Sequence, residues 1–106
     1  MSVFYDHLLG LEELHNAILE QDLPTKQHYH LLRLTDSTLH HEVLNVILIE
    51  IPQAVHEHFL VTFHKNPHDP NHFDYIKQFS PKIEEKITSA ADETRTRMLA
   101  EFKSSL

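Results

Sequence analysis

Val43-Leu-Asn-Val-Ile-Leu-Ile-Glu-Ile51 is the most apolar stretch of this sequence, with seven apolar residues in nine. After Pro52 the apolar residues soon resume, most densely in Phe59-Leu-Val-Thr-Phe63. A segment that is apolar on every side must be covered on every side, because its exposure to water is unfavourable. The rest of the chain is therefore expected to pack around residues 39–63.

The secondary structure of this stretch is ambiguous, since its β-branched residues favour a strand and its near-continuous apolarity fits either a strand or a helix. Its flanks favour a helix, because Leu39 and Val43, like Val55 and Phe59, are four residues apart. The link around Pro52 also lacks a favoured two-residue hairpin turn. Helices are predicted, and the alternative is an α+β fold with strands at 43–51 and 59–63.

Glycine is almost absent, with one residue in 106, whereas about 7% is usual. Hairpin-rich folds and phosphate-binding loops need glycine in their tight turns, so all-β architectures and Gly-rich nucleotide loops are excluded. The length suits one domain, residues 1–106. The predicted fold is all-α, a compact bundle of about five or six helices that ends in a long amphipathic helix.

The first half of the chain carries three boundary signals. Gly10 interrupts a helical pattern over residues 3–19 and is expected to adopt the left-handed conformation that ends a first short helix. Leu23-Pro24-Thr25 is a second break, with Thr25 as a candidate N-cap. Thr35-Asp36-Ser37 is expected to end that helix, since short polar side chains compete with helical hydrogen bonds.

The second half begins with a loop at residues 66–71, which contains two prolines. A short helix is expected to follow it. Ser80-Pro81 supplies an N-cap and a first-turn proline, so a long helix is predicted from there to Phe102. Its 22–24 residues would measure about 35 Å, against a diameter of roughly 33 Å for a compact chain of this size. Its last turns are therefore expected to project, fray or contact another subunit.

The charge is acidic and unevenly distributed. Residues 1–76 carry three Lys/Arg and eleven Asp/Glu, whereas residues 77–106 carry six and five. Such a surface repels a phosphate backbone, so direct nucleic-acid binding is not expected. A less favoured alternative is an acidic inhibitor that mimics nucleic acid and occupies a basic groove on its partner.

The chain has no Cys, which excludes disulfide scaffolds and thiolate chemistry and fits a reducing compartment. Its first residues lack the basic and apolar regions of a signal peptide. No apolar run approaches the roughly 20 residues that span a bilayer. A cytoplasmic location and no membrane insertion are expected.

The eleven histidines are the one feature that suggests chemistry. Protonation of all of them would move the formal charge from −7 to +4, so the protein is expected to be least soluble between about pH 5 and 6. A His-rich metal-binding or pH-responsive protein is therefore an alternative function, with a divalent transition metal as cofactor. The candidate ligands are His56, His58, His64, His68 and His72.

No catalytic constellation is apparent, since adjacent carboxylates such as Glu12-Glu13 and Glu84-Glu85 fit solvated helix faces, and His-Glu-x-x-His is absent. An enzyme is not expected, and no cofactor beyond that metal. The favoured function is a small acidic protein-interaction module that binds a protein partner or a second copy of itself. Its expected contact residues lie on the terminal helix at Ile87, Thr94, Met98 and Phe102.

Leu9-Gly10-Leu11, Leu23-Pro24 and the run Tyr75-Ile-Lys-Gln-Phe-Ser-Pro-Lys-Ile83 before a charged terminal helix resemble a small helical family of unknown function from candidate-phylum bacteria. The resemblance covers about a quarter of the chain. It implies an all-helical bacterial domain with no known activity and no site residues.

Overall fold

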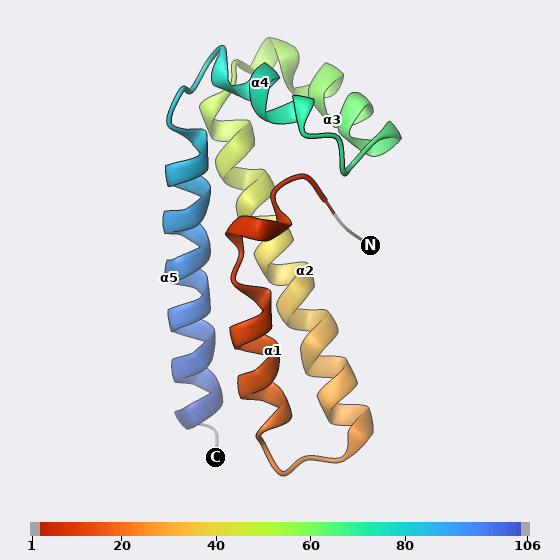
Figure 1. Cartoon of the computed structure of the whole chain (residues 1–106), viewed down its shortest axis with the longest axis vertical. Helices are drawn as coiled ribbons and strands as arrows, with labels where there is room; N and C mark the ends of the chain where they lie inside the picture. Colours follow the sequence, from red (N-terminus) through yellow and green to blue (C-terminus); the bar gives the residue numbers. More distant parts are fainter. Residues whose placement is uncertain (1–2, 105–106) are drawn as a thin grey trace.

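The computed structural model describes residues 3–104, with side chains to Glu101, and all regular structure in that range is helical. Three helices run along the long axis: α1 (Leu11–Leu19), α2 (Thr25–Glu50) and α5 (Ile83–Ser104). The shorter α3 (His56–Lys65) and α4 (Asn71–Lys77) close one end, as Figure 1 shows. The 3-10 turns η1 (Asp6–Leu8) and η2 (Gln53–Val55) precede α1 and α3. The all-α prediction is confirmed, including the long carboxy-terminal helix.

The alternative with two strands is wrong. Residues 43–50 form the last two turns of α2, and residues 59–63 lie within α3. The link between these helices contains Ile51 in an extended conformation followed by Pro52, which cannot donate a helical hydrogen bond. Helical spacing on both sides of Pro52 therefore predicts this region better than the content of β-branched residues does.

The predicted boundary at Thr35-Asp36-Ser37 is wrong, because α2 runs unbroken through it. Thr35 is fully buried, and Asp36 binds a histidine of α1. These tertiary contacts outweigh the weak preference of short polar residues for non-helical backbone. Residues 43–50 of the central apolar stretch are consequently the last two turns of a 26-residue helix.

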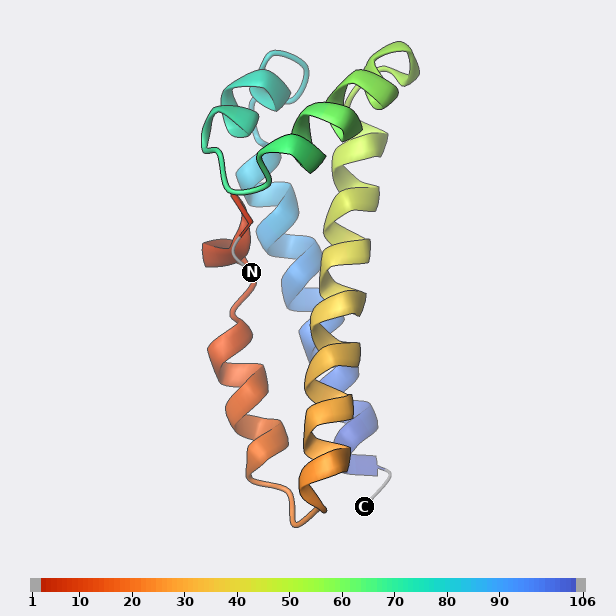
Figure 2. The same cartoon turned by 90° about the vertical axis from the view of Figure 1, so that its right-hand side faces the viewer.

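The bundle is elongated, with principal extents of 45 × 24 × 20 Å. Helices α2 and α5 lie side by side along most of its length (Figures 1 and 2). A 26-residue helix measures about 39 Å, enough to cover α5 along its length. Met98, four turns into α5, is only 7% exposed. The expectation that the last turns of α5 project from the domain assumed a nearly spherical shape. In the elongated bundle, α5 stays packed against the rest of the chain at least up to Met98.

Buried side chains recur at helical spacing and meet in one core. Leu39, Val43 and Ile47 of α2 face Ile83, Ile87 and Ala91 of α5, and all six are fully buried. Each large apolar side chain buried in this way contributes about 1.5–3 kcal/mol relative to an exposed one. At the closed end the core becomes aromatic, with contributions from Phe4, Tyr5, Phe59, Phe63 and Phe73.

The amino-terminal segment, residues 3–9, fills the space between α2 and the closed end. Phe4, Tyr5 and Leu9 are buried, and the backbone N–H of Phe4 donates to the carbonyl of Pro67 at 2.8 Å. Gly10 then adopts a φ of 63° and precedes α1 directly, which confirms the predicted left-handed break. The segment is therefore an integral part of the core.

The start of α5 differs in detail from the prediction. The helix begins at Ile83, and residues 81 and 82 form a turn. The buried Ser80 contributes its carbonyl oxygen, which accepts a hydrogen bond from the N–H of Ile83 at 3.1 Å.

Across the described residues, no helix is both long and apolar enough to cross a membrane.

Candidate functional sites

The histidines proposed as metal ligands are not gathered into a metal site. Among the described residues, no three His, Asp or Glu side chains are placed to hold an ion together. His72 is buried between aromatic rings, with ring centroids 5.0 Å from Phe4 and 5.9 Å from Phe63. His58, His64 and His68 are exposed at different places around the α3–α4 end.

Three histidines instead stabilise the connections between helices. Each donates a hydrogen bond from Nε2 to a carbonyl oxygen that precedes it by five to seven residues. The pairs are His28 with Gln21 at 2.8 Å, His56 with Ile51 at 3.1 Å and His72 with Asn66 at 2.6 Å. Carbonyls near helix ends lack a helical partner. The carbonyls of Gln21 and Asn66 also accept from the backbone N–H groups of Leu23 and Asp69, so there the imidazole adds a second hydrogen bond. These contacts explain part of the histidine excess without invoking a ligand.

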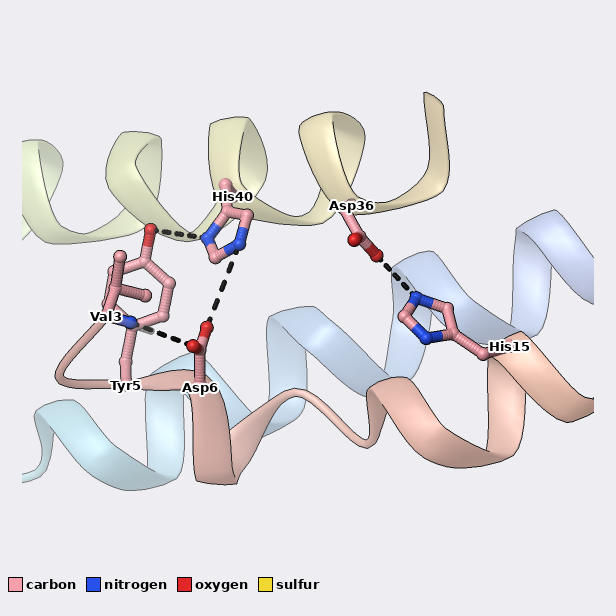
Figure 3. A network of polar contacts seen from close by, with 6 residues as sticks. All are labelled: Val3, Tyr5, Asp6, His15, Asp36 and His40. Atoms are coloured by element: carbon pink, nitrogen blue, oxygen red, sulfur yellow. Dashed lines mark hydrogen bonds and ion pairs between the residues drawn. The ribbon is translucent and has the colours of Figure 1, made fainter. Parts of the chain in front are cut away.

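A polar network joins the amino-terminal segment to α2 (Figure 3). Nδ1 of His40 lies 3.0 Å from the hydroxyl of Tyr5, and its Nε2 lies 3.7 Å from Oδ1 of Asp6. Oδ2 of Asp6 accepts a hydrogen bond from the N–H of Val3 at 2.8 Å. A proton on Nε2 faces Asp6 and leaves Nδ1 to accept from Tyr5. The network thus pins residues 3–6 to the middle of α2.

The order Tyr5–His40–Asp6 superficially resembles a catalytic triad, but the tyrosine is not activated. Burial raises the pKa of Tyr5 well above its usual value, and the charge of Asp6 raises it further. A nucleophile or base needs a lowered pKa or an exposed reacting atom, and Tyr5 has neither. The chemistry that this arrangement supports is hydrogen bonding within the fold.

Three of the four contact residues expected on the terminal helix lie inside the bundle. Ile87, Thr94 and Met98 are buried in the packing of α5 within the chain. The side chain of Phe102 lies outside the described residues. Sequence periodicity identifies an apolar stripe, but it does not tell whether that stripe packs on the same chain or on another one.

An apolar groove lies between the amino-terminal segment, α2 and α3. Its volume is about 720 Å³, and it is open to solvent on one side. The lining residues are Val3, Tyr5, His40, Leu44, Phe63, His64 and Pro67. They are far apart in the sequence, and no motif marks them.

The first three turns of α2 carry an exposed cationic surface, here named the α2 outward face and made up of Lys26, Tyr29, His30, Arg33 and Leu34. Tyr29 is 63% exposed and Leu34 is 52% exposed. The guanidinium carbon of Arg33 lies 5.7 Å from the centre of the Tyr29 ring. No residue from Thr25 to Leu34 is fully buried.

A sequence signal for this face exists but is easily missed. No Asp or Glu occurs from Leu23 to Thr35, although the whole chain has a net charge of −7. Two of the three Lys/Arg residues in positions 1–76 fall in this short stretch. When the net charge is summed over a longer segment, such as residues 1–76, the surrounding carboxylates hide this local excess of cations.

In comparisons with known proteins, the chain matches no family model, no curated protein and no solved structure. What it does has therefore to be inferred from its own geometry.

Proposed function

We propose that this chain is a non-enzymatic protein-interaction module and that its partner binds the α2 outward face. The observation that carries the proposal is the exposure of Tyr29 and Leu34 between Lys26 and Arg33, on a chain that is otherwise strongly acidic. Tyrosine and arginine are the residue types that most often dominate the energy of protein interfaces.

The chemistry of this face defines the partner that suits it. Its apolar side chains suit the apolar stripe of a helix, and its cations suit carboxylates beside that stripe. The flanking Asp22 and Asp36 would repel an acidic segment that extends beyond the face, so a short contact is favoured. The partner is therefore an acidic amphipathic helix, supplied by another protein or by a second copy of this chain.

A titration tests the proposal. The probe is a fluorescein-labelled helical peptide with leucines at helical spacing and glutamates on either side, measured by anisotropy at about 0.1 M salt. The wild-type chain is expected to bind it, and Arg33→Glu is expected to weaken binding at least about tenfold. Circular dichroism checks that the variant remains folded.

The matched control is Lys82→Glu, which makes the same charge change at an exposed lysine beyond the α2 outward face. It is expected to weaken binding less than about threefold, through long-range electrostatics alone. Equal losses in the two variants, or no binding by the wild-type chain, would refute the proposal.

A further inference from the structure

The apolar groove has features of a small-molecule site that the interaction function does not use. The rings of Tyr5 and Phe63 close its floor, stacked with centroids 6.4 Å apart, but they are only 1% and 7% exposed. The apolar surface that a ligand can reach therefore belongs mainly to Val3, Leu44 and Pro67, which are partly exposed. Leu44 of α2 borders it and remains partly exposed. A volume of about 720 Å³ falls within the range of roughly 300–1,000 Å³ that is usual for such sites.

The groove is held open by bonds on two of its sides. The hydrogen bond between Tyr5 and His40 fixes the floor to α2, and the bond from Phe4 N–H to the carbonyl of Pro67 fixes the amino-terminal segment to the loop after α3. Because the groove is already formed, a ligand would not have to order its walls on binding.

The polar groups that line the groove select the chemistry of the ligand. No Asp, Glu, Lys or Arg is among the lining residues. Nδ1 of His40 is hydrogen-bonded to Tyr5, and its Nε2 faces Oδ1 of Asp6 at 3.7 Å, so both nitrogens face groups of the chain itself. His64 is exposed at the groove, and within the part of the chain that the structure describes its ring makes no hydrogen bond. An imidazole offers N–H donors and can become cationic, so it suits an anionic oxygen.

We propose that this groove binds an apolar molecule that carries a carboxylate, with the apolar part against Val3, Leu44 and Pro67 and the carboxylate at His64. A cationic ligand finds no carboxylate in the lining, and a phosphate ester finds no Lys or Arg. The site is separate from the α2 outward face, so either proposal can fail without the other.

Two probes with the same ring system and opposite charge test the proposal: naphthylacetate and naphthylethylamine. Each is titrated into the ¹⁵N-labelled wild-type chain and followed by amide chemical shifts. Naphthylacetate is expected to bind with a Kd below about 1 mM and to shift the amides of Val3, Leu44 and His64. Naphthylethylamine is expected to bind at least about fivefold more weakly, because no lining group pairs with its charge.

Two groove variants and one control locate the ligand. Leu44→Trp fills the groove and is expected to weaken both probes by more than about tenfold, whereas Leu19→Trp, at an exposed leucine at the end of α1 and outside both proposed binding surfaces, leaves both unchanged. His64→Glu changes only an exposed side chain and is expected to reverse the preference, so that the amine binds more tightly than the acid. His64→Glu keeps the test decisive if Leu44→Trp does not fold.

Three results would overturn the proposal. They are the absence of shifts at the groove at millimolar naphthylacetate, equal affinities for the acid and the amine in the wild-type chain, and a preference that His64→Glu leaves unchanged.

Discussion

Asp36 and His40 lie one turn apart on α2, and they bind α1 and the amino-terminal segment, respectively. Asp36 accepts a hydrogen bond from Nε2 of His15 on α1 at 2.6 Å, and His40 contacts Tyr5 and Asp6 ahead of α1. The two pairs have opposite polarity, since α2 supplies the carboxylate in one and the imidazole in the other (Figure 3). Residues 3–19 are thus fixed to α2 at two neighbouring points.

The pair of His15 and Asp36 is expected to be coupled energetically. Removing either side chain breaks a short hydrogen bond between partly exposed groups, which is worth about 0.5–1 kcal/mol. Urea unfolding of Asp36→Ala, His15→Ala and the double variant measures the coupling, and the cycle cancels the higher helix propensity of Ala. Additive effects of the two substitutions would show that the contact contributes nothing to stability.

The environment of Tyr5 predicts the response of stability to alkaline pH. Burial raises the pKa of Tyr5, and so, less strongly, does the charge of Asp6. The unfolded chain releases the proton near the ordinary pKa of about 10, at a pH where the folded chain still holds it. The stabilisation is therefore complete below about pH 10 and is lost as the pH rises above that value.

Tyr5→Phe tests this expectation. At pH 7 the variant is expected to lose about 1 kcal/mol with the hydrogen bond to His40. Above about pH 10 its free energy of unfolding should fall less steeply than that of the wild type. Lys77, whose pKa is raised by its hydrogen bond to Glu84, is present in both proteins and cancels. Parallel slopes for the two proteins would argue against the account of Tyr5.

Thr35→Val is expected to stabilise the protein by about 1 kcal/mol. The hydroxyl of Thr35 is buried and has no hydrogen-bond partner in the described part of the chain, and valine has the same shape without the polar group. Thr38→Val is the control, because the hydroxyl of Thr38 donates to the carbonyl of Leu34 at 2.8 Å. Thermal and urea unfolding measure both. A less stable Thr35→Val would mean that this hydroxyl is satisfied in solution.

Gly10→Ala is expected to destabilise the protein by about 1–2 kcal/mol, because residue 10 adopts a left-handed conformation that disfavours a Cβ. The added Cβ would also lie 2.8 Å from Cζ of Arg95. In an Arg95→Ala background the contact is gone and only the conformational cost remains, so the loss should be smaller there. An unchanged midpoint of urea unfolding in Gly10→Ala would contradict the left-handed conformation.

Local patterns in the sequence predicted the all-helical class and the left-handed conformation of Gly10, but not the full length of α2. The step of four between Leu39 and Val43, and between Val55 and Phe59, indicates helix in a region whose composition also allows strand. The steps of four residues and the break at Gly10 can both be recognised from residues within about one helical turn. The continuity of α2 through Thr35 and Asp36 depends instead on α1, which is distant in the sequence.

The candidate sites were much harder to predict. The groove is built from side chains between Val3 and Pro67, and only the path of the chain brings them together. Periodicity correctly marks Ile87 and Met98 as an apolar stripe, yet that stripe serves the core. The α2 outward face is the exception, since a local gap in the acidic residues around Arg33 could have identified it.

The most direct test of the interaction surface is a chemical-shift map of the ¹⁵N-labelled chain with the acidic helical peptide. If the peptide binds as proposed, the perturbed amides will cluster between Lys26 and Leu34, and in Arg33→Glu the same perturbations will require at least about tenfold more peptide. Perturbations concentrated on α5, or absent at saturating peptide, would contradict the assignment of the α2 outward face as the binding surface.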